Sequence, residues 1–270
     1  RNKMGQVAYN LKGIATVTRQ KYLTASEKGP WANSYDRWRN DNLTNRYQGV
    51  QFGYTSAGRY TSWNDIWSYP GYKERDILPG DYKYEDWNGD GEINGQDEHP
   101  FAFDQTPWLQ FSLNAGLQWK NLDFNMLLQG SALGSMEYKE PLHEIWGKNG
   151  GGALTQFLDR WHPVDPKADP YDPSTVWTSG HYAYTGRWAK NNSAFNRVST
   201  AYLRLKSIEL GYTFPKLKQI PNASLRIYAN AYNLLTFTGV KFVDPEHPDD
   251  DLGRMYPLNK TYTLGVSLSF

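Results

Sequence analysis

The last ten residues of the chain, 261–270, constrain its fold more than any other stretch. Apolar side chains alternate there with small polar ones, at Tyr262, Leu264, Val266, Leu268 and Phe270. Because successive side chains of an extended strand point to opposite sides, this strand has one apolar face and one polar face. Such a strand fits a wall between hydrocarbon and a wet interior, and it also fits the closing strand of a soluble sandwich. Recurrence of the pattern decides between these two interpretations.

The same alternation recurs in five earlier segments, which are 6–18, 108–120, 122–129, 202–214 and 225–232. In 202–214 the phase slips by one residue near Lys206 and Ser207, which predicts a β-bulge. The apolar face is expected to contact lipid through Leu225, Ile227, Leu264, Val266 and Leu268. The polar face is expected to line a lumen with Asn125, Tyr228, Asn230, Thr263, Ser267 and the charged residues Asp123, Arg204, Lys206, Glu209 and Arg226, whose charges we expect to pair with a plug domain.

The connections between these strands differ greatly in length. Loops 20–106 and 132–199 are long and 238–259 is intermediate, whereas the turns at 120–121 and 215–221 are short. Outer-membrane barrels have short periplasmic turns and long extracellular loops, while a Greek-key sandwich gives no reason for this asymmetry. We therefore expect the three longer loops to be extracellular and Phe270 to be periplasmic. The extended run 49–55 is then predicted to be a strand within the first loop.

The expected fold is all-β, an antiparallel transmembrane β-barrel fragment with long extracellular loops. Six strands are too few to close, since small single-chain barrels have about eight and an open edge in hydrocarbon leaves backbone groups unpaired. We expect residues 1–270 to be the C-terminal portion of a larger barrel. The chain starts at Arg1 without Met or a signal peptide, so earlier segments are expected to have been processed off or to lie upstream.

Composition excludes several other classes of protein. A formal net charge of +1 leaves no basic excess to neutralise nucleic-acid phosphates. No window of about eighteen apolar residues predicts a membrane helix. The sequence contains no cysteine, which excludes disulfides and thiolate metal sites. Metalloprotease, α/β-hydrolase and P-loop motifs are absent from the sequence, and its five histidines are scattered, so we expect no enzymatic activity.

An acidic loop at residues 86–97 has the spacing of a calcium-binding loop. Its oxygen-bearing residues occupy the positions that wrap Ca²⁺ in an EF-hand, with Gly91 at the turn: Asp86, Asn88, Asp90, Glu92, Asn94 and Asp97. Two features depart from that pattern, because the final ligand is the shorter Asp97 and Pro79-Gly80 precludes an ordinary entering helix. Ca²⁺ is thus a candidate cofactor. The alternative is an ion-free turn in which these side chains cap their own backbone.

The long loops are rich in aromatic residues. Flat amphipathic rings pack on sugar rings while their polar edge stays hydrated. The candidate residues for contacts with substrate or partner are therefore Trp63, Trp67, Tyr69, Trp146, Trp161, Trp177 and Trp188. The alternative is that loops of this length need small cores of their own. Both interpretations stay open at this point.

A series of motifs in consistent order resembles the C-terminal part of SusC/RagA-type TonB-dependent transporters. The motifs are Gly53-Tyr-Thr-Ser-Ala-Gly58, Pro79-Gly80-Asp81, the acidic loop from Asp86 to Asn94, Tyr202 to Pro215, Asn233 to Thr238, Asp244-Pro-Glu246, Tyr256-Pro257 and Thr261 to Gly265 with a terminal Phe. The resemblance implies a 22-stranded outer-membrane barrel with an N-terminal plug, a TonB-contacting segment and a SusD-like surface lipoprotein as a lid. The sequence given contains neither the plug nor the TonB segment.

The resemblance implies a function for the whole protein. It implies TonB-dependent import of large nutrients across the outer membrane of a Gram-negative bacterium of the Bacteroidetes type, with oligosaccharides as the favoured cargo. Its partners would be the lipoprotein, TonB through the missing N-terminal part, and outer-membrane lipid. The alternatives are an oligopeptide importer of the same family and a soluble or surface adhesion module built on the calcium-type loop.

Overall fold

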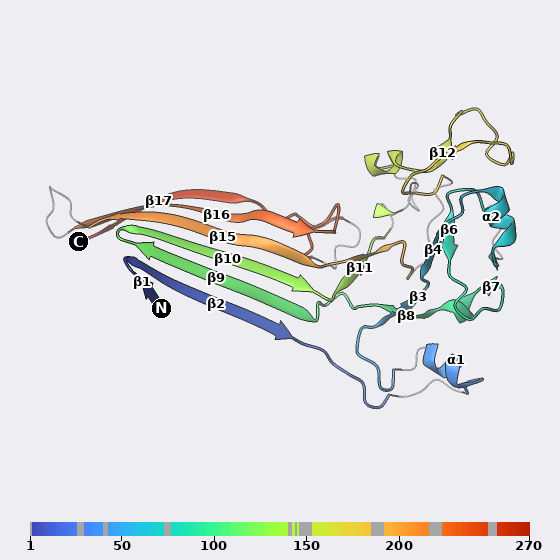
Figure 1. The fold of residues 1–270 in the computed structure, drawn as a ribbon, viewed down its shortest axis with the longest axis horizontal. Coiled ribbons are helices and arrows are strands. Elements are labelled where there is room, and N and C mark those ends of the chain that lie inside the picture. The colour runs from blue at the N-terminus through green and yellow to red at the C-terminus, as the bar shows by residue number, and fades with distance from the viewer. Residues whose placement is uncertain are drawn as a thin grey trace.

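The computed structural model describes residues 2–25, 30–39, 43–72, 77–139, 142–143, 145, 153–184, 192–215, 223–247 and 253–270. Its main feature is one antiparallel sheet with the strand order β1–β2–β9–β10–β15–β16–β17 (Figure 1). These strands span Asn2–Met4, Val7–Val17, Leu109–Trp119, Leu122–Ala132, Tyr202–Phe214, Ser224–Thr238 and Thr261–Ser269. Neighbours in the sheet are neighbours in sequence among these strands, as in a barrel wall built from hairpins.

Six of these strands coincide with the six segments expected from the sequence, so the all-β antiparallel architecture is confirmed. The short strand β1 was not expected, because three residues are too few to show an alternation. β1 pairs with β2 through a turn at Gly5, where φ is +61°. Glycine suits this turn because it has no Cβ to clash in the left-handed region.

The predicted bulge in β15 is confirmed by the cross-strand register. Ser207 pairs with Tyr232, but the next pair along β15 joins Leu205 to Leu235. Lys206 therefore lacks a directly opposite partner on β16, and Asn233 on that strand has a φ of +53°. The same slip appears against β10, between Leu127 and Leu128. A bulge of this kind re-aims the side chains on either side of it.

The register aligns like with like on each face of the sheet. One row runs through Leu117, Phe124, Leu210, Ala229 and Leu264 in successive strands. The next row, on the opposite face, runs through Gln118, Asp123, Gly211, Tyr228 and Gly265. Leu264 is 85% exposed and Val266 is 68% exposed. An apolar face this open is unfavourable in water and suits contact with hydrocarbon.

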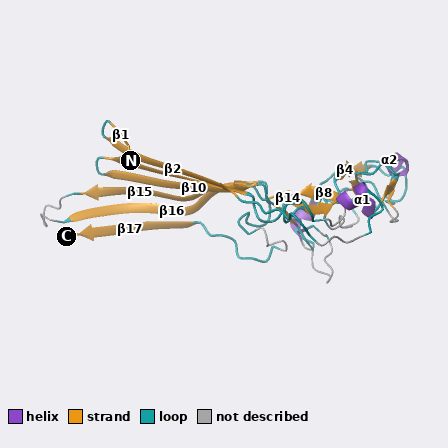
Figure 2. Cartoon of the chain, turned by 90° about the horizontal axis from the view of Figure 1, so that it is seen from below, coloured by secondary structure: helices purple, strands orange, loops and turns teal. Residues whose placement is uncertain are grey.

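The long connections leave the sheet at one end and fold together beyond it (Figures 1 and 2). The first contains α1 (Ser34–Arg39), β3 (Gln51–Gly53) paired with β8 (His99–Ala102), β4 (Ser56–Arg59) paired with β6 (Tyr82–Tyr84), α2 (Trp63–Ser68), β5 (Gly71–Tyr72) beside β7 (Glu92–Ile93), and the 3-10 turn η1 (Gly95–Asp97). The second contains β11 (Ser135–Glu137) paired with β14 (Arg197–Ser199), η3 (Thr155–Leu158), and β12 (His162–Pro163) paired with β13 (Trp177–Thr178).

Residues of both long loops make one aromatic core. Tyr54, Tyr82, Tyr84 and Ile93 from the first loop are buried with Ala183 from the second. The backbone of Tyr54 is tied to the second loop at both ends, since its N–H donates to the Asn192 carbonyl at 3.0 Å and its carbonyl accepts from the Ala194 N–H at 2.9 Å. These two loops therefore form a single body, which we call the loop body.

Strand β3 belongs to the loop body and not to the main sheet, as the sequence predicted for 49–55. A side chain at Gly53 would collide with the carbonyl group of Asn192, so the two loops approach each other there more closely than a Cβ allows. None of the helices in the described part of the chain has the length and apolar content needed to cross a membrane.

Adjacent residues of β17 test which face meets lipid. In the full-length protein, Leu264→Arg should lower the free energy of unfolding in a bilayer by about 2–4 kcal/mol, because it places a charge on the apolar face. Thr263→Arg should cost much less, because Thr263 lies on the face of Asn230, its partner in the register. Urea titration of the refolded protein measures both values, and equal costs at the two positions would contradict the assignment of faces.

Candidate functional site

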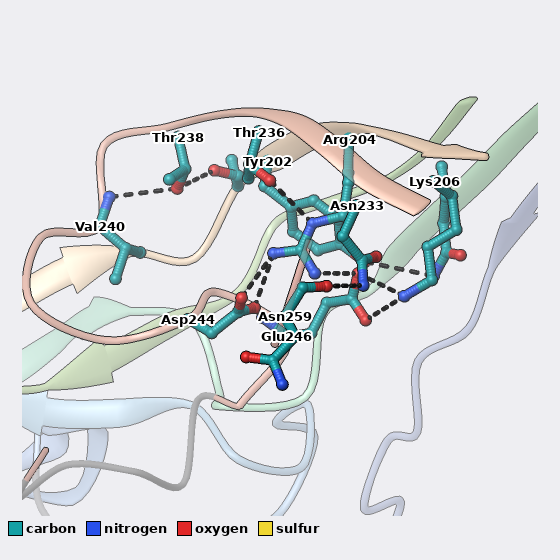
Figure 3. Close-up of polar contacts among 12 residues, drawn as sticks. Tyr202, Arg204, Lys206, Asn233, Thr236, Thr238, Val240, Asp244, Glu246 and Asn259 are labelled. Carbon is teal, nitrogen blue, oxygen red and sulfur yellow. Dashed lines mark hydrogen bonds and ion pairs between the residues drawn. The ribbon is translucent and has the colours of Figure 1, made fainter. Parts of the chain in front are cut away.

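The polar face of the sheet carries a buried ion network near the end from which the loops leave (Figure 3). Arg204 on β15 is its centre and is only 1% exposed. Its Nη2 lies 2.8 and 2.7 Å from the two carboxylate oxygens of Asp244, and its Nη1 lies 2.9 Å from Oε1 of Glu246. Its Nε donates to the Thr236 hydroxyl at 2.9 Å. Asp244 and Glu246 belong to the connection that follows β16, so Arg204 holds this connection against the polar face.

Lys206 completes the network from the bulge. Its Nζ lies 2.9 Å from Oε2 of Glu246, and the Glu246 N–H donates to Asp244 at 2.9 Å. Arg204 and Lys206 are two residues apart on one strand, so both point to the polar face and both reach Glu246. A buried guanidinium is tolerated only when its charge is matched in this way.

A second ion cluster lies nearer the other end of the same face. Arg226 on β16 contacts Asp123 on β10 at 2.5 Å and Glu209 on β15 at 2.7 Å. The Arg226–Asp123 pair crosses directly over Gly211, where a Cβ would collide with both side chains. The guanidinium also lies 4.8 Å from the ring centre of Tyr228. The absent side chain at Gly211 therefore makes room for a charge pair to span three strands.

Glycines also make room for the other residues expected on this face. The ring of Tyr228 covers Gly265, and the side-chain oxygens of Asn10 and Asn125 converge over Gly116. Asn230 lies in the same row as Glu209 and Thr263, and its buried Oδ1 has no hydrogen-bond partner within the described residues. Within the described chain the charges of this face pair with one another and with Asp244 and Glu246. Their pairing with a plug domain stays a prediction.

A hollow of about 710 Å³ lies beside the Arg204 network. It is lined from β2, β9, β10 and β15 and by the connections that adjoin them, with side chains that include Thr16, Gln110, Gln129, Ser131, Tyr202 and Glu246. Gln129 donates to the Tyr202 hydroxyl at 3.3 Å, and the buried hydroxyl of Ser131 has no partner within the described residues. The lining is mixed, since these amide and hydroxyl groups lie beside the apolar side chains of Ile14, Phe111 and Leu127, so the hollow suits a neutral ligand with both polar and apolar surfaces or a polypeptide.

The acidic loop is held together by hydrogen bonds from its own backbone. Asp86 accepts from the N–H groups of Gly89 and Gly91 at 2.8 and 2.9 Å. Asn88 and Asp90 each accept from the N–H two residues further on, at 3.0 and 2.8 Å. Asn94 accepts in the same way from Gln96 at 2.7 Å. Glu92 is exposed on β7.

Asp97 closes the acidic loop from a fully buried position. One carboxylate oxygen accepts from Trp87 N–H at 2.9 Å, and the other accepts from Asn94 N–H at 2.8 Å. Within the described residues, no three His, Asp or Glu side chains come together as a group that could hold a metal ion. These hydrogen bonds are the ones expected when the side chains cap their own backbone. Calcium binding at residues 86–97 stays a prediction.

The structure brings three of the candidate tryptophans together. Trp63 from the first loop and Trp161 and Trp177 from the second line one hollow of about 270 Å³, with Thr61, Ser62, Pro79, Pro173, Thr175 and Ser179. Trp67 lies beside it, with its ring 6.0 Å from that of Trp63, and is 68% exposed. Sequence spacing gave no sign of this convergence, because about a hundred residues separate Trp63 from Trp161.

The other aromatic candidates have different positions. Tyr69 packs against the loop core, with its ring 6.0 Å from Tyr60 and its hydroxyl donating to the Tyr84 carbonyl at 2.8 Å. It therefore has the structural role that the sequence left open for the loop aromatics. Trp146 and Trp188 lie outside the described residues.

Burial is the main cause of the shifted pKa values in the loop body. Burial raises the pKa of Tyr60 and of Tyr182 to about 12 each, so both phenols stay protonated at neutral pH. Burial, with the nearby Arg59 guanidinium, lowers the pKa of His181, so its imidazole is neutral at pH 7. At pH 7 these three side chains are therefore uncharged groups that can form hydrogen bonds.

Sequence reasoning missed the roles of Asp244, Glu246 and Arg59. The first two were visible as part of a motif, but nothing in the sequence paired them with Arg204. Arg59 joins the two long loops, because its guanidinium donates to the carbonyls of Gly80 and His181 and lies 4.2 Å from the ring centre of Tyr82. A single basic residue in a long loop carries no sequence signal for such a role.

Arg204 and Lys206 form a matched pair for measuring the network. In the full-length protein, Arg204→Ala should cost about 3–5 kcal/mol of unfolding free energy, because it leaves two carboxylates without their buried partner. Lys206→Ala should cost about 0–1 kcal/mol, because the Lys206 side chain is 29% exposed. Hydrogen exchange at 239–247 should rise only in the Arg204 variant. Similar costs and exchange in the two variants would show that Arg204 does not hold this connection.

Comparison with known proteins identifies relatives along most of the chain. No family model matches it. It is 28% identical over 211 residues to TonB-dependent receptor P3 of Formosa agariphila, covering 72% of this chain and 19% of that receptor. It is 27% identical over 239 residues to TonB-dependent receptor P26 of the same organism, covering 83% of this chain and 22% of the receptor. The chain thus spans about a fifth of the length of these relatives.

Solved structures share the fold. The RagAB peptide importer in the closed-closed state matches with a TM-score of 0.61 and 18% identity, covering 100% of this chain and 28% of the matched chain. A structure of the RagAB peptide transporter matches with a TM-score of 0.53 and 21% identity, covering 82% and 22%. The motifs, the relatives and the fold agree: the chain is similar in sequence to TonB-dependent receptors and shares the fold of the matching part of the RagAB structures.

Proposed function

We propose that this chain is the C-terminal wall of a transporter that imports large nutrients across a bacterial outer membrane, using energy delivered through TonB. The observation that carries the proposal is the main sheet itself. Its strands present one continuous apolar face and one polar face with paired charges and a polar hollow. A wall of this kind separates lipid from a hydrated passage. The sequence similarity to receptors named TonB-dependent supports TonB as the source of energy for import.

The proposal extends to parts of the protein outside this chain. The whole barrel would have 22 strands and a plug, with residues 1–270 as its C-terminal portion. Loops 20–106, 132–199 and 238–259 would face outward, Phe270 would lie at the periplasmic rim, and a SusD-like lipoprotein would close over the loop body. Support comes from the length of these loops, since loops much longer than connection requires usually carry function.

We propose oligosaccharides as the cargo. The two hollows described above are lined by hydroxyl, amide and aromatic groups, and these match the hydroxyl groups and apolar ring faces of sugars. The RagAB structures are named for peptide import, but a similarity of 18–21% identity supports only a shared fold and not a shared cargo. Peptide import is therefore the competing outcome of the test.

The test is uptake by cells that lack the full-length protein, compared with the same cells carrying it on a plasmid. Fluorescent neutral hexasaccharides of glucose, mannose, galactose and xylose are offered beside labelled hexapeptides. We expect at least one hexasaccharide to enter only complemented cells, and its uptake to stop when TonB is deleted.

Each other outcome contradicts a part of the proposal. Uptake of peptides but of no hexasaccharide would overturn the cargo. Hexasaccharide uptake that persists without TonB would overturn the energy source. Uptake that does not depend on the protein would overturn the import function.

A further inference from the structure

The hollow lined by Trp63, Trp161 and Trp177 has the features of a binding site for a single ring-shaped ligand. Its volume of about 270 Å³ lies just below the roughly 300–1,000 Å³ of pockets for drug-sized molecules. It therefore has room for one sugar ring and not for a longer oligomer. The long loops build it jointly, at the junction of α2 with the β12–β13 hairpin.

The tryptophan rings of this hollow are held in place by contacts within the protein. Trp161 is 9% exposed and packs on Gly80, where a Cβ would collide with its side chain. Trp177 lies on β13 with its ring edge-on to Tyr184 at 5.4 Å. Trp63 is fixed at the start of α2, whose first turn is capped by Ser62. Rigid aromatic groups lose little conformational freedom on binding, which favours affinity.

The polar groups of the hollow point to a ligand rich in hydroxyl groups. Two buried indole N–H groups, those of Trp63 and Trp177, have no hydrogen-bond partner within the described residues. Buried indole N–H groups usually have a partner, so these two donors call for an acceptor. The lining also includes the hydroxyl residues Thr61, Thr175 and Ser179. Hydroxyl groups both donate and accept, as sugar hydroxyls do, whereas each peptide backbone group does only one.

Charge at the hollow favours a neutral ligand. None of the described residues that line it is charged. Asp172, next to Pro173 of the lining, accepts from the N–H and the hydroxyl of Ser174 at 2.8 and 2.7 Å. Asp65, two residues from Trp63, forms an ion pair with Lys83 at 2.7 Å and accepts from the N–H of Thr61 at 3.0 Å. Its charge is thus already matched within the first loop. A uronic acid or a charged peptide side chain would find no counter-ion in the lining.

We propose that this hollow, together with exposed Trp67, binds a neutral sugar unit at the outer surface of the transporter. The unit would lie among the three tryptophans, and its hydroxyl groups would form hydrogen bonds with the side chains of Thr61, Thr175 and Ser179. The next unit of the chain would pack on Trp67, whose ring is 6.0 Å from that of Trp63. The proposal rests on the proposed function, because it requires that the loop body faces the medium.

The test is calorimetric binding to the purified full-length transporter in detergent. The probes are neutral hexasaccharides of glucose, mannose, galactose and xylose, an oligogalacturonate of the same length, and hexaproline. We expect a neutral hexasaccharide to bind and the oligogalacturonate not to bind. Trp177→Ala and Trp63→Ala should each weaken binding about tenfold, a loss typical of a lost ring contact. Trp177→Phe should recover part of it, because the ring face returns without the N–H.

Ser179→Phe separates loss of the site from loss of folding. Ser179 is exposed and lines the hollow, so a phenyl ring there fills the space without removing a packed side chain. This variant should abolish binding while thermal unfolding stays unchanged. Trp38→Ala is the matched control, because Trp38 is 43% exposed on α1 and does not line the hollow, and it should bind as the parent does.

Three results would overturn the proposal. They are unchanged hexasaccharide binding in Ser179→Phe, an equal loss in Trp38→Ala, and binding of hexaproline in preference to every sugar. If a hexasaccharide is imported but these variants bind it normally, the hollow is wrong and the proposed function stands. If no hexasaccharide is either bound or imported, the proposed function fails as well.

Discussion

The two-residue period of the β-strand is the constraint on which this structure depends. A strand that separates hydrocarbon from water must satisfy opposite demands on alternate residues, and its backbone groups must pair with neighbouring strands. The register meets both demands, since rows such as Phe124–Leu210–Ala229 and Asp123–Gly211–Tyr228 stay on their own faces across successive strands. A slip of one residue anywhere would exchange the two faces of that strand. The bulge near Lys206 absorbs the phase slip in β15, so that Leu205 and Leu210 both stay on the apolar face, opposite Leu128 and Phe124.

Ion pairs on the polar face connect neighbouring strands. The Arg226–Asp123–Glu209 cluster joins β10, β15 and β16, and glycine at position 211 leaves the space it needs. The Arg204 network joins β15 to the connection that follows β16. Charges buried in this way favour one geometry more than they favour stability, because desolvation offsets much of their attraction. In the proposed function they would hold polar side chains in fixed positions along the wall of a hydrated passage.

Much of the main sheet could be predicted from sequence because each face has a uniform environment. The strand positions, the bulge and the loop strand at 51–53 all follow from alternation and connection length. Strand β1 was not predicted, because three residues are too few to show the alternation of apolar and polar side chains. The pairing of Arg204 with Asp244 escaped because contacts across forty residues depend on tertiary folding. The tryptophan hollow escaped for the same reason, since the seven aromatic candidates could not be sorted until Tyr69 was seen in the loop core and Trp63, Trp161 and Trp177 were seen together.

The central claim is that the loop body faces the medium while the short turns face the periplasm. Residues 1–270 contain no cysteine, so labelling at an introduced cysteine is read against the unsubstituted full-length protein as background. Lys167→Cys lies on the β12–β13 hairpin of the loop body, and Lys120→Cys lies in the β9–β10 turn, and both lysines are exposed. In intact cells, a maleimide that does not cross the outer membrane should label position 167 and leave position 120 unlabelled until the membrane is permeabilised. Labelling of position 120 in intact cells, with position 167 protected, would contradict the account.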